Sequence, residues 1–268
     1  MERPGRLVLL GHPVAHSLSP ALQNAALRRA GIPMTYEAMD VTPARLAKVA
    51  GLLQDGGAAG NVTVPHKEAF AALCSRRSPV AERVGAVNTF WTEQGDLVGD
   101  NTDVGGLDAA VHRHFGHRDE RGVVVVLGAG GAAAAVLAAA ERWSSTQVRI
   151  VARTRKRAEA LAARFGRLAA VYDHAPDAMA GAWLVVNATP VGLDDRAFPL
   201  DPALIPAGTD VLDLTYRRGE TPWVHACRAR GLRGADGLAM LVEQGALAFE
   251  RWFGVIPDRE AMWNAVRE

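Results

Sequence analysis

The stretch that decides the fold is Val123-Val-Val-Val-Leu127-Gly-Ala-Gly-Gly-Ala-Ala133. Its first five residues form a largely β-branched apolar run, typical of a strand buried on both faces of a parallel sheet. The last six fit the pattern G-x-G-x-x-A and lead into an Ala-rich helix, which is the context that a dinucleotide-binding loop requires. Gly128 is expected to form the tight turn, Gly130 to let the backbone approach a pyrophosphate, and Ala133 to allow close helix–sheet packing. A glycine-rich turn in an unrelated α/β protein is the alternative.

The residues after the next expected strand, Gln147–Val151, indicate which dinucleotide is bound. NAD-binding proteins place an acidic side chain about twenty residues after the glycines, where it binds the ribose 2′-hydroxyl. This chain reads Val151-Ala-Arg-Thr-Arg-Lys-Arg157 there, with no acid before Glu159. Four basic residues and a threonine suit a 2′-phosphate, which an arginine can bind with two hydrogen bonds. The sequence therefore favours NADP, and a solvated basic helix start is the alternative.

Further α/β signals lie on both sides of this region. The expected strands are Leu7–Leu10, Tyr36–Val41, Ala59–Val64, Val123–Leu127, Gln147–Val151, Leu184–Asn187 and Asp210–Leu214. Helical patterns cover 21–30, 44–54 and 66–73, and a last apolar helix is expected at Leu238–Phe253. Ser19 and Pro20 are expected to be the N-cap and first residue of the first helix. For the first hundred residues this alternation predicts a parallel sheet covered by helices, and a second α/β unit follows from Gly122.

Composition excludes several classes of protein. The chain has 268 residues, of which 49% are hydrophobic and 22% charged, and its net charge is +1. It therefore carries no electrostatic footprint for nucleic acid or an anionic membrane. No apolar run is long enough for a signal peptide or a membrane span, which favours a cytoplasmic protein. Cys74 and Cys227 lie far apart and are expected to be reduced. No Cys/His combination has zinc spacing, so no metal is expected.

Lys67 stands out because the chain almost never uses lysine. Only three of its 30 basic residues are lysines, and one of them ends the run Asn61-Val-Thr-Val-Pro-His-Lys67. A lysine can be tuned to give up its proton whereas an arginine cannot, so this position is a candidate for proton transfer. Asn61, Asn88 and Asn101 also lie near Lys67 in the sequence. Their planar amides suit the binding of a polyhydroxylated ligand, and ordinary turn chemistry is the alternative.

Asp103 is the expected partner of Lys67. Asn101-Thr-Asp103 lies where the two predicted units join, and Lys67 follows a strand, so both side chains are placed to line the crevice outside the strand ends. A carboxylate that orients an amine is a plausible acid–base pair, and a surface ion pair is the alternative. In the run His16-Ser-Leu-Ser-Pro20, Ser19 is expected to cap a helix, and the Ser17 and Ser19 hydroxyls are also expected to bind a ligand.

Seven runs together resemble the shikimate dehydrogenase family, in the family's order and essentially from end to end. They are Gly11–Pro20, Asn61–Lys67, Gly85–Thr89, Gly99–Asp103, Gly128–Ala133, Asn187–Thr189 and Gly237–Ala246. Any one run is weakly specific, but seven in order are highly specific. The resemblance implies an oxidoreductase that catalyses the NADP-linked, reversible reduction of 3-dehydroshikimate to shikimate, a step in aromatic amino-acid biosynthesis.

The resemblance also implies roles for individual residues. Lys67 and Asp103 become the catalytic pair. The residues implied to bind the substrate are Ser17, Ser19, Thr63, Lys67, Asn88, Asp103, Tyr216 and Gln244. Those implied to bind NADP are Gly128, Ala129, Gly130, Gly131, Ala132, Arg153, Thr154, Arg157, Leu214 and Gly237.

The implied fold class is α/β with two domains. Residues 1–103 and 238–268 form an N-terminal α/β substrate domain to which the C-terminal helix returns, and residues 104–237 form a Rossmann-like NADP-binding domain. One departure is Ala152, where the family usually has Asn before Arg-Thr. Two alternatives stay open: a quinate/shikimate dehydrogenase paralogue that uses NAD, and a non-catalytic NADPH-sensing protein. The oligomeric state is also open, with a homodimer as one option.

Overall fold

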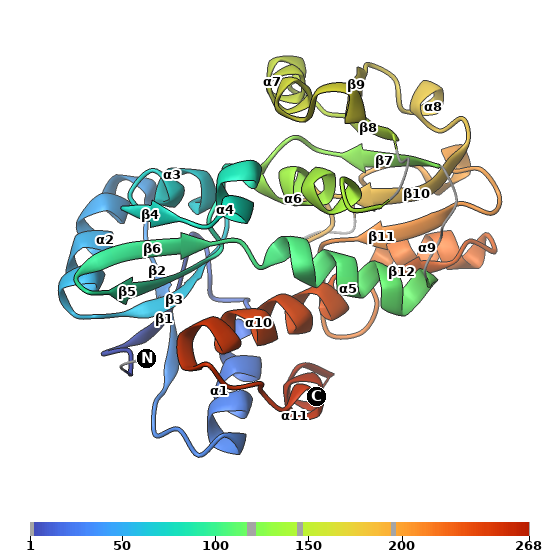
Figure 1. Cartoon of the computed structure of the whole chain (residues 1–268). Helices are drawn as coiled ribbons and strands as arrows, with labels where there is room; N and C mark the ends of the chain where they lie inside the picture. Colours follow the sequence, from blue (N-terminus) through green and yellow to red (C-terminus); the bar gives the residue numbers. More distant parts are fainter. Residues whose placement is uncertain (1–2, 117–121, 144–146, 194–196, 268) are drawn as a thin grey trace. The chain divides into compact units, whose positions relative to one another are not determined.

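The computed structural model describes residues 3–116, 122–143, 147–193 and 197–267 (Figure 1). The chain forms two compact units, which we call the first and the second unit. The first unit is Met1–Gly106 with Leu241–Glu268, and the second is Leu107–Met240. Among the described residues, no helix is both long and apolar enough to cross a membrane.

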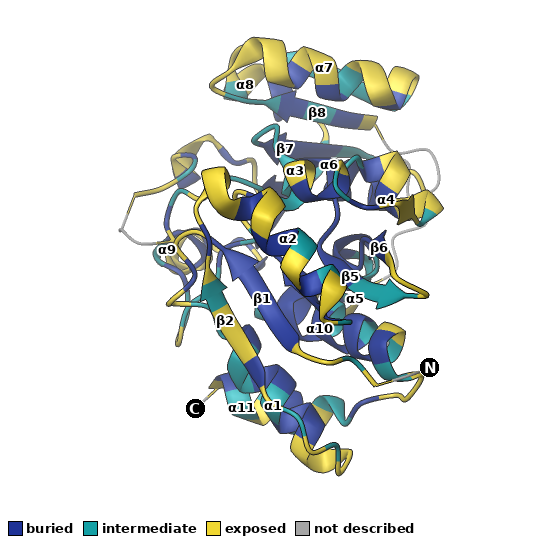
Figure 2. Cartoon of the chain, turned by 90° about the vertical axis from the view of Figure 1, so that its left-hand side faces the viewer, coloured by how far each residue is buried: buried dark blue, intermediate teal, exposed yellow. Residues whose placement is uncertain are grey.

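The sheet of the first unit has six strands in the order β2-β1-β3-β5-β6-β4. Its strands are β1 (Leu7–Gly11), β2 (Tyr36–Asp40), β3 (Ala59–Val62), β4 (Arg76–Arg77), β5 (Thr89–Glu93) and β6 (Asp96–Asp100). β1 pairs in parallel with both β2 and β3, as predicted. β1 is buried along its whole length, whereas the edge strand β2 is largely exposed (Figure 2).

The prediction of a wholly parallel sheet is wrong for this unit. β5 runs antiparallel to β3 and to β6, so half of the sheet is built around a hairpin. Gln94 and Gly95 form its turn, both with positive φ angles of 54° and 84°. A two-residue turn of this kind matches the twist of the flanking strands and joins them directly. The hairpin brings the end of β6 next to the start of β5, where the candidate site lies.

Helices cover both faces of this sheet (Figure 1). One face carries η1 (Pro43–Arg45), α2 (Leu46–Asp55), α3 (Lys67–Ala71) and α4 (Pro79–Val84), and the other carries α1 (Ser19–Arg29), α10 (Leu238–Phe253) and α11 (Arg259–Arg267). Trp252 of α10 stacks on Tyr36, with ring centroids 5.9 Å apart, and donates a hydrogen bond of 3.1 Å to Thr89 Oγ1. The helix α10 thus returns to the first unit, as predicted for Leu238–Phe253.

The start of α1 differs from the prediction. Ser19 is the first helical residue and Leu18 occupies the N-cap position, with no capping bond from its side chain. The Ser17 hydroxyl oxygen instead accepts a hydrogen bond of 3.2 Å from the Ser19 backbone N–H. A helix leaves its first N–H groups without partners, and here a side chain one residue before the N-cap satisfies one of them. Ser19 is therefore not the cap.

The sheet of the second unit is wholly parallel, in the order β12-β11-β10-β7-β8-β9. Its strands are β7 (Val123–Leu127), β8 (Gln147–Val151), β9 (Ala169–Tyr172), β10 (Ala182–Asn187), β11 (Asp210–Asp213) and β12 (Gly234–Ala235). The predicted bounds of β7 and β8 are confirmed, β10 begins two residues earlier than predicted, and β11 ends one residue earlier. β9 and β12 were not predicted.

The helices of the second unit are α6 (Gly131–Ala140), α7 (Arg155–Phe165), α8 (Ala175–Ala178) and α9 (Pro222–Ala229), with η2 (Gly166–Leu168), η3 (Pro202–Leu204) and most of α5 (Asp103–Phe115). Ala133 is fully buried, as close packing of α6 requires. Cys74 lies in the first unit and Cys227 in the second, and both are free thiols. Burial raises the pKa of each to about 12, so both stay protonated at neutral pH.

Candidate active site

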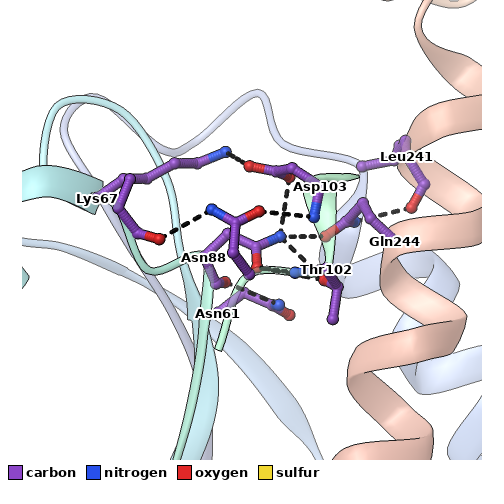
Figure 3. A network of polar contacts seen from close by, with 9 residues as sticks. Asn61, Lys67, Asn88, Thr102, Asp103, Leu241 and Gln244 are labelled. Atoms are coloured by element: carbon purple, nitrogen blue, oxygen red, sulfur yellow. Dashed lines mark hydrogen bonds and ion pairs between the residues drawn. The ribbon is translucent and has the colours of Figure 1, made fainter. Parts of the chain in front are cut away.

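The candidate site of the first unit is centred on Lys67 and Asp103 (Figure 3). Lys67 is the first residue of α3, and Asp103 is the first residue of α5. Lys67 Nζ donates a hydrogen bond of 2.6 Å to Asp103 Oδ2. The Asp103 side chain is only 5% exposed and that of Lys67 is 18% exposed, so the alternative of a surface ion pair does not hold. The N-terminus of α5 also favours the negative charge of Asp103.

Asn88 holds the second oxygen of the Asp103 carboxylate. Its Nδ2 lies 2.8 Å from Asp103 Oδ1, 3.0 Å from Thr102 Oγ1 and 3.1 Å from Gln244 Oε1. Its Oδ1 accepts a hydrogen bond of 2.7 Å from the Thr102 backbone N–H. Gln244 reaches this group from α10, where its Nε2 donates to the Leu241 carbonyl (Figure 3). The Asn88 amide thus joins the Asp103 carboxylate, the segment before α5 and the helix α10.

Asn61 and Asn101 make hydrogen bonds within the protein, and ligand binding by their amides stays a prediction. Asn61 accepts from the Tyr36 hydroxyl at 2.8 Å and donates to the Asn88 carbonyl at 3.1 Å. Asn101 accepts from the Asp103 backbone N–H at 3.1 Å and donates to the Ala86 carbonyl at 2.9 Å. Both side chains are buried. They fix the backbone around the candidate site.

Ser17 and Thr63 lie in the two segments that follow the neighbouring parallel strands β1 and β3. The Thr63 N–H donates to the Leu10 carbonyl at 2.8 Å, and the His12 N–H donates to the Val64 carbonyl at 3.0 Å. A methyl group on Gly11 would lie 2.6 Å from Thr63 Cγ2, so glycine permits this close approach. The carboxyl ends of parallel strands meet at one sheet edge, which is where ligands bind in α/β folds.

The candidate cofactor loop lies in the second unit, between β7 and α6. Gly128 has a φ of +115°, and a methyl group there would lie 2.9 Å from the Ala188 carbonyl oxygen, so this position requires glycine. Gly130 is the N-cap of α6 and has an extended backbone, and a methyl group there would meet nothing within 4 Å. Gly131 and Ala132 open the helix. The open space at this helix N-terminus fits a bound phosphate.

The polar residues after β8 differ in whether acidic side chains of the protein bind them. Arg155 forms ion pairs with Asp173 and, at 2.8 Å, with Glu159. Hydrogen bonds to Asp173 and Glu159 raise the pKa of Arg155. Arg153 and Thr154 are exposed beside it, where Thr154 is the N-cap of α7 and makes no capping bond. Arg153 and Thr154 therefore fit a 2′-phosphate better than Arg155 does.

A buried carboxylate, which sequence reasoning missed, joins the loops after β10 and β11. Asp213 Oδ1 accepts from Asn187 Nδ2 at 2.8 Å and from the Thr215 N–H at 3.0 Å, while Oδ2 accepts from Thr221 Oγ1 at 2.9 Å. Burial raises the pKa of Asp213, and these hydrogen bonds oppose that rise. The sequence does hold a signal for this contact, because Asn187 and Asp213 are the last residues of the neighbouring strands β10 and β11.

Three residues that the resemblance assigns to ligands lie near Asp213. Leu214 and Tyr216 follow it in the sequence, and Gly237 hydrogen-bonds the same segment. Gly237 donates to the Thr215 carbonyl at 2.9 Å, and a methyl group on Gly237 would lie 2.5 Å from the Leu214 carbonyl oxygen. The structure thus brings Leu214 and Gly237 together. Tyr216, which the resemblance assigns to substrate, follows β11 in the second unit, whereas the other residues assigned to substrate belong to the first. No metal-binding group of three or more His, Cys, Asp or Glu occurs in the described parts of the chain.

Comparison with known proteins identifies the family. Residues 9–90 match the model of the shikimate dehydrogenase substrate binding domain, and residues 237–267 match that of the shikimate 5′-dehydrogenase C-terminal domain. The chain is 42% identical to a shikimate dehydrogenase (NADP(+)) of Mesorhizobium japonicum, over 99% of this chain and 96% of that protein.

Solved structures give the same result. The shikimate 5-dehydrogenase of Thermus thermophilus, in complex with NADP(H) and shikimate, is 41% identical with a TM-score of 0.88, over 98% of both chains. A quinate dehydrogenase of Corynebacterium glutamicum in complex with NAD is 28% identical with a TM-score of 0.87, over 98% of this chain and 99% of that chain. Of these two, the higher identity lies with the enzyme that binds NADP(H). The chain therefore belongs to the shikimate dehydrogenase family.

Proposed function

We propose that this protein catalyses the NADP-dependent, reversible reduction of 3-dehydroshikimate to shikimate, with Lys67 and Asp103 as its acid–base pair. The observation that carries the acid–base assignment is the hydrogen bond of 2.6 Å between Lys67 Nζ and the nearly buried carboxylate of Asp103. A non-catalytic NADPH sensor would need binding but no proton relay, so this pair argues against it. Fold alone would not decide between the two.

In the reducing direction, the chemistry that bound NADPH would supply is a hydride for the carbon of the ring ketone. The ketone oxygen then gains negative charge and requires one proton, which Lys67 donates from its ammonium group. Asp103 orients that group through Oδ2, while Asn88 fixes Oδ1 at 2.8 Å. In the oxidising direction Lys67 accepts the hydroxyl proton. Proton transfer by a positioned side chain contributes roughly 10²- to 10⁴-fold to such a rate.

The substrate carboxylate is assigned to the hydroxyls of Ser17 and Ser19. Since the Ser17 oxygen accepts the Ser19 N–H, its own hydroxyl proton is left to donate to an anion. Ser19 is mostly buried and Ser17 is half-buried. Thr63, Asn88 and Gln244 in the first unit are assigned to the substrate hydroxyls, together with Tyr216.

The cofactor is assigned to the second unit. Gly130 and the N-terminus of α6 would hold the pyrophosphate, with Gly128, Ala129, Gly131 and Ala132 shaping the loop. Leu214 and Gly237 would hold the nicotinamide side, and Arg153, Thr154 and Arg157 the 2′-phosphate. The open space at Gly130 supports the first assignment, and the exposure of Arg153 and Thr154 supports the last.

A substrate and cofactor matrix tests this function against its nearest rival. Initial rates are measured from the absorbance of the reduced nicotinamide with shikimate or quinate, each with NADP⁺ or NAD⁺. The proposal expects the highest kcat/KM for shikimate with NADP⁺. A higher kcat/KM with NAD⁺ and quinate would identify the NAD-using paralogue instead, and no turnover with any pair would support the sensor.

Arg153→Ala is expected to raise KM for NADP⁺ by roughly 10- to 100-fold, the size of a lost hydrogen bond to a charged group. KM for NAD⁺, which lacks the 2′-phosphate, should change little. Arg155→Ala is the matched control, because Asp173 and Glu159 already bind that guanidinium. Steady-state kinetics with both cofactors measure the difference. Equal losses with NADP⁺ and NAD⁺ in Arg153→Ala would show that Arg153 does not bind the 2′-phosphate.

A further inference from the structure

Asp100, the last residue of β6, carries another buried carboxylate next to the segment that leads to α5. Its side chain is 6% exposed. Oδ1 accepts from the Ser78 hydroxyl and, at 2.7 Å, from the Asn101 N–H, while Oδ2 accepts from Arg251 Nε at 2.9 Å. Arg251 belongs to α10, so this carboxylate joins the end of β6 to that helix.

Asn101 extends the same chain of contacts to Asp103. Its Oδ1 accepts from the Asp103 backbone N–H, and its Nδ2 donates to the Ala86 carbonyl. The Asn88 N–H donates to the Asp100 carbonyl at 3.1 Å, and the Val87 N–H donates to the Lys67 carbonyl at 3.0 Å. The short segment 86–88 is therefore bonded to the backbone of Lys67 on one side and to the segment that carries Asp103 on the other.

We propose that Asp100, held by Arg251, and Asn101 are positioning residues that set the geometry of the Lys67–Asp103 pair. Their side chains hydrogen-bond Ser78, Arg251 and the backbone of Ala86, Asn101 and Asp103, and they act by fixing the backbone from which Asp103 projects. A shift of about 1 Å at a reacting group can cost about 10²-fold in rate, so a small relaxation of this segment is enough to matter. The inference rests on the proposed function, because it assigns these residues to its proton transfer.

Of the two residues in the Asp100–Arg251 ion pair, the more exposed one is the better choice for substitution. Arg251 is 58% exposed, whereas Asp100 is nearly buried. Arg251→Met keeps the apolar stem of the side chain and leaves Asp100 with neutral donors only. Arg251→Lys returns a positive charge to the same place. Arg259→Met is the matched control, since Arg259 also forms ion pairs with α10, to Glu243 at 2.9 Å and Glu250 at 3.1 Å.

The experiment measures kcat, both KM values, the melting temperature and the solvent deuterium isotope effect on kcat. We expect Arg251→Met to lower kcat by about tenfold or more, with KM for shikimate and NADP⁺ changed less than about twofold. Its isotope effect should rise, because proton transfer becomes slower, and Arg251→Lys should recover most of kcat. Arg259→Met should keep the parent kcat and isotope effect whatever its melting temperature.

Several outcomes would overturn the inference. One is a parent-like kcat in Arg251→Met. Another is a loss of kcat that Arg259→Met matches at an equal loss of melting temperature, since the ion pair would then be merely structural. If Arg251→Met does not fold, Asp100→Asn takes its place, and a parent-like kcat and isotope effect there would count equally against the inference. A parent enzyme that does not oxidise shikimate would instead reject the proposed function, so the two failures are distinguishable.

Discussion

Lys67→Arg is expected to lower kcat for shikimate oxidation by roughly 10²-fold or more, the scale of lost acid–base catalysis. Arginine keeps the positive charge and can still donate a hydrogen bond to Asp103 Oδ2, while Asn88 keeps Oδ1. Its guanidinium cannot be deprotonated in a protein, so it cannot exchange a proton with the substrate hydroxyl at neutral pH. KM for shikimate should change much less, because binding needs only the charge. Steady-state kinetics measure both parameters.

Three variants control this experiment. Lys67→Ala should be as poor in kcat, and Asp103→Asn should be impaired because the amine loses its anionic partner at 2.6 Å. Lys48→Arg makes the same chemical change at an exposed position of α2 and should leave kcat at the parent value. A folded Lys67→Arg enzyme that turns over near the parent rate would remove Lys67 from the chemistry and leave it as a binding residue.

The second large effect is expected at Gly130. A methyl group there would meet no described residue other than its chain neighbours within 4 Å, so Gly130→Ala should fold with a free energy of unfolding within about 1 kcal/mol of the parent. The same methyl group would occupy the space that the pyrophosphate needs, so the affinity for NADP⁺ should fall about tenfold or more. Chemical denaturation and fluorescence titration with NADPH measure the two quantities separately.

Gly128→Ala is the matched comparison and should lower both the free energy of unfolding and the affinity for NADP⁺. Its φ of +115° strains any residue with a Cβ, at a cost of about 1–3 kcal/mol, and the new methyl group would lie 2.9 Å from the Ala188 carbonyl oxygen. Retention of parent affinity in Gly130→Ala would contradict the assignment of this loop to the pyrophosphate. Retention of parent stability in Gly128→Ala would contradict the strain argument.

Local sequence signals predicted the second unit well. The run Val123–Leu127 and the strand Gln147–Val151 have the predicted bounds, because a buried parallel strand needs a continuous apolar run. The glycine pattern also predicted a tight turn at Gly128 that leads into a helix, and the structure has this turn before α6. The short strands β9 and β12 have weaker apolar sequence patterns. They form by pairing with the exposed edges of β8 and β11, which the sequence does not reveal.

The first unit shows where local reasoning ends. The antiparallel hairpin β5–β6 depends on its pairing with β3, which the sequence of residues 89–100 alone does not predict. Both Ser17 and Ser19 could accept a hydrogen bond at the start of α1. In the structure the Ser17 hydroxyl oxygen accepts one from the Ser19 N–H. Such choices depend on tertiary packing, which a one-dimensional pattern does not contain.

The candidate site divides in the same way. The rarity of lysine and the seven runs identified Lys67, Asp103, Asn88 and Gln244, which the structure joins in one network (Figure 3). The same clustering also suggested Asn61 and Asn101, whose amides bind backbone and side-chain groups of the protein. A sequence shows which residue types lie near one another, but which amide faces a ligand depends on long-range contacts such as that between Asn61 and Tyr36.

The most direct test of Lys67 as the proton carrier is the rate of NADPH formation by Lys67→Ala in the presence of added methylamine or guanidinium. Both cations bring positive charge to Asp103, but only an amine, with a pKa near the lysine value of about 10.4, can take the hydroxyl proton of shikimate. If Lys67 carries the proton, the rate rises with the concentration of free methylamine and does not respond to guanidinium. Equal rates with the two cations would contradict proton transfer by Lys67.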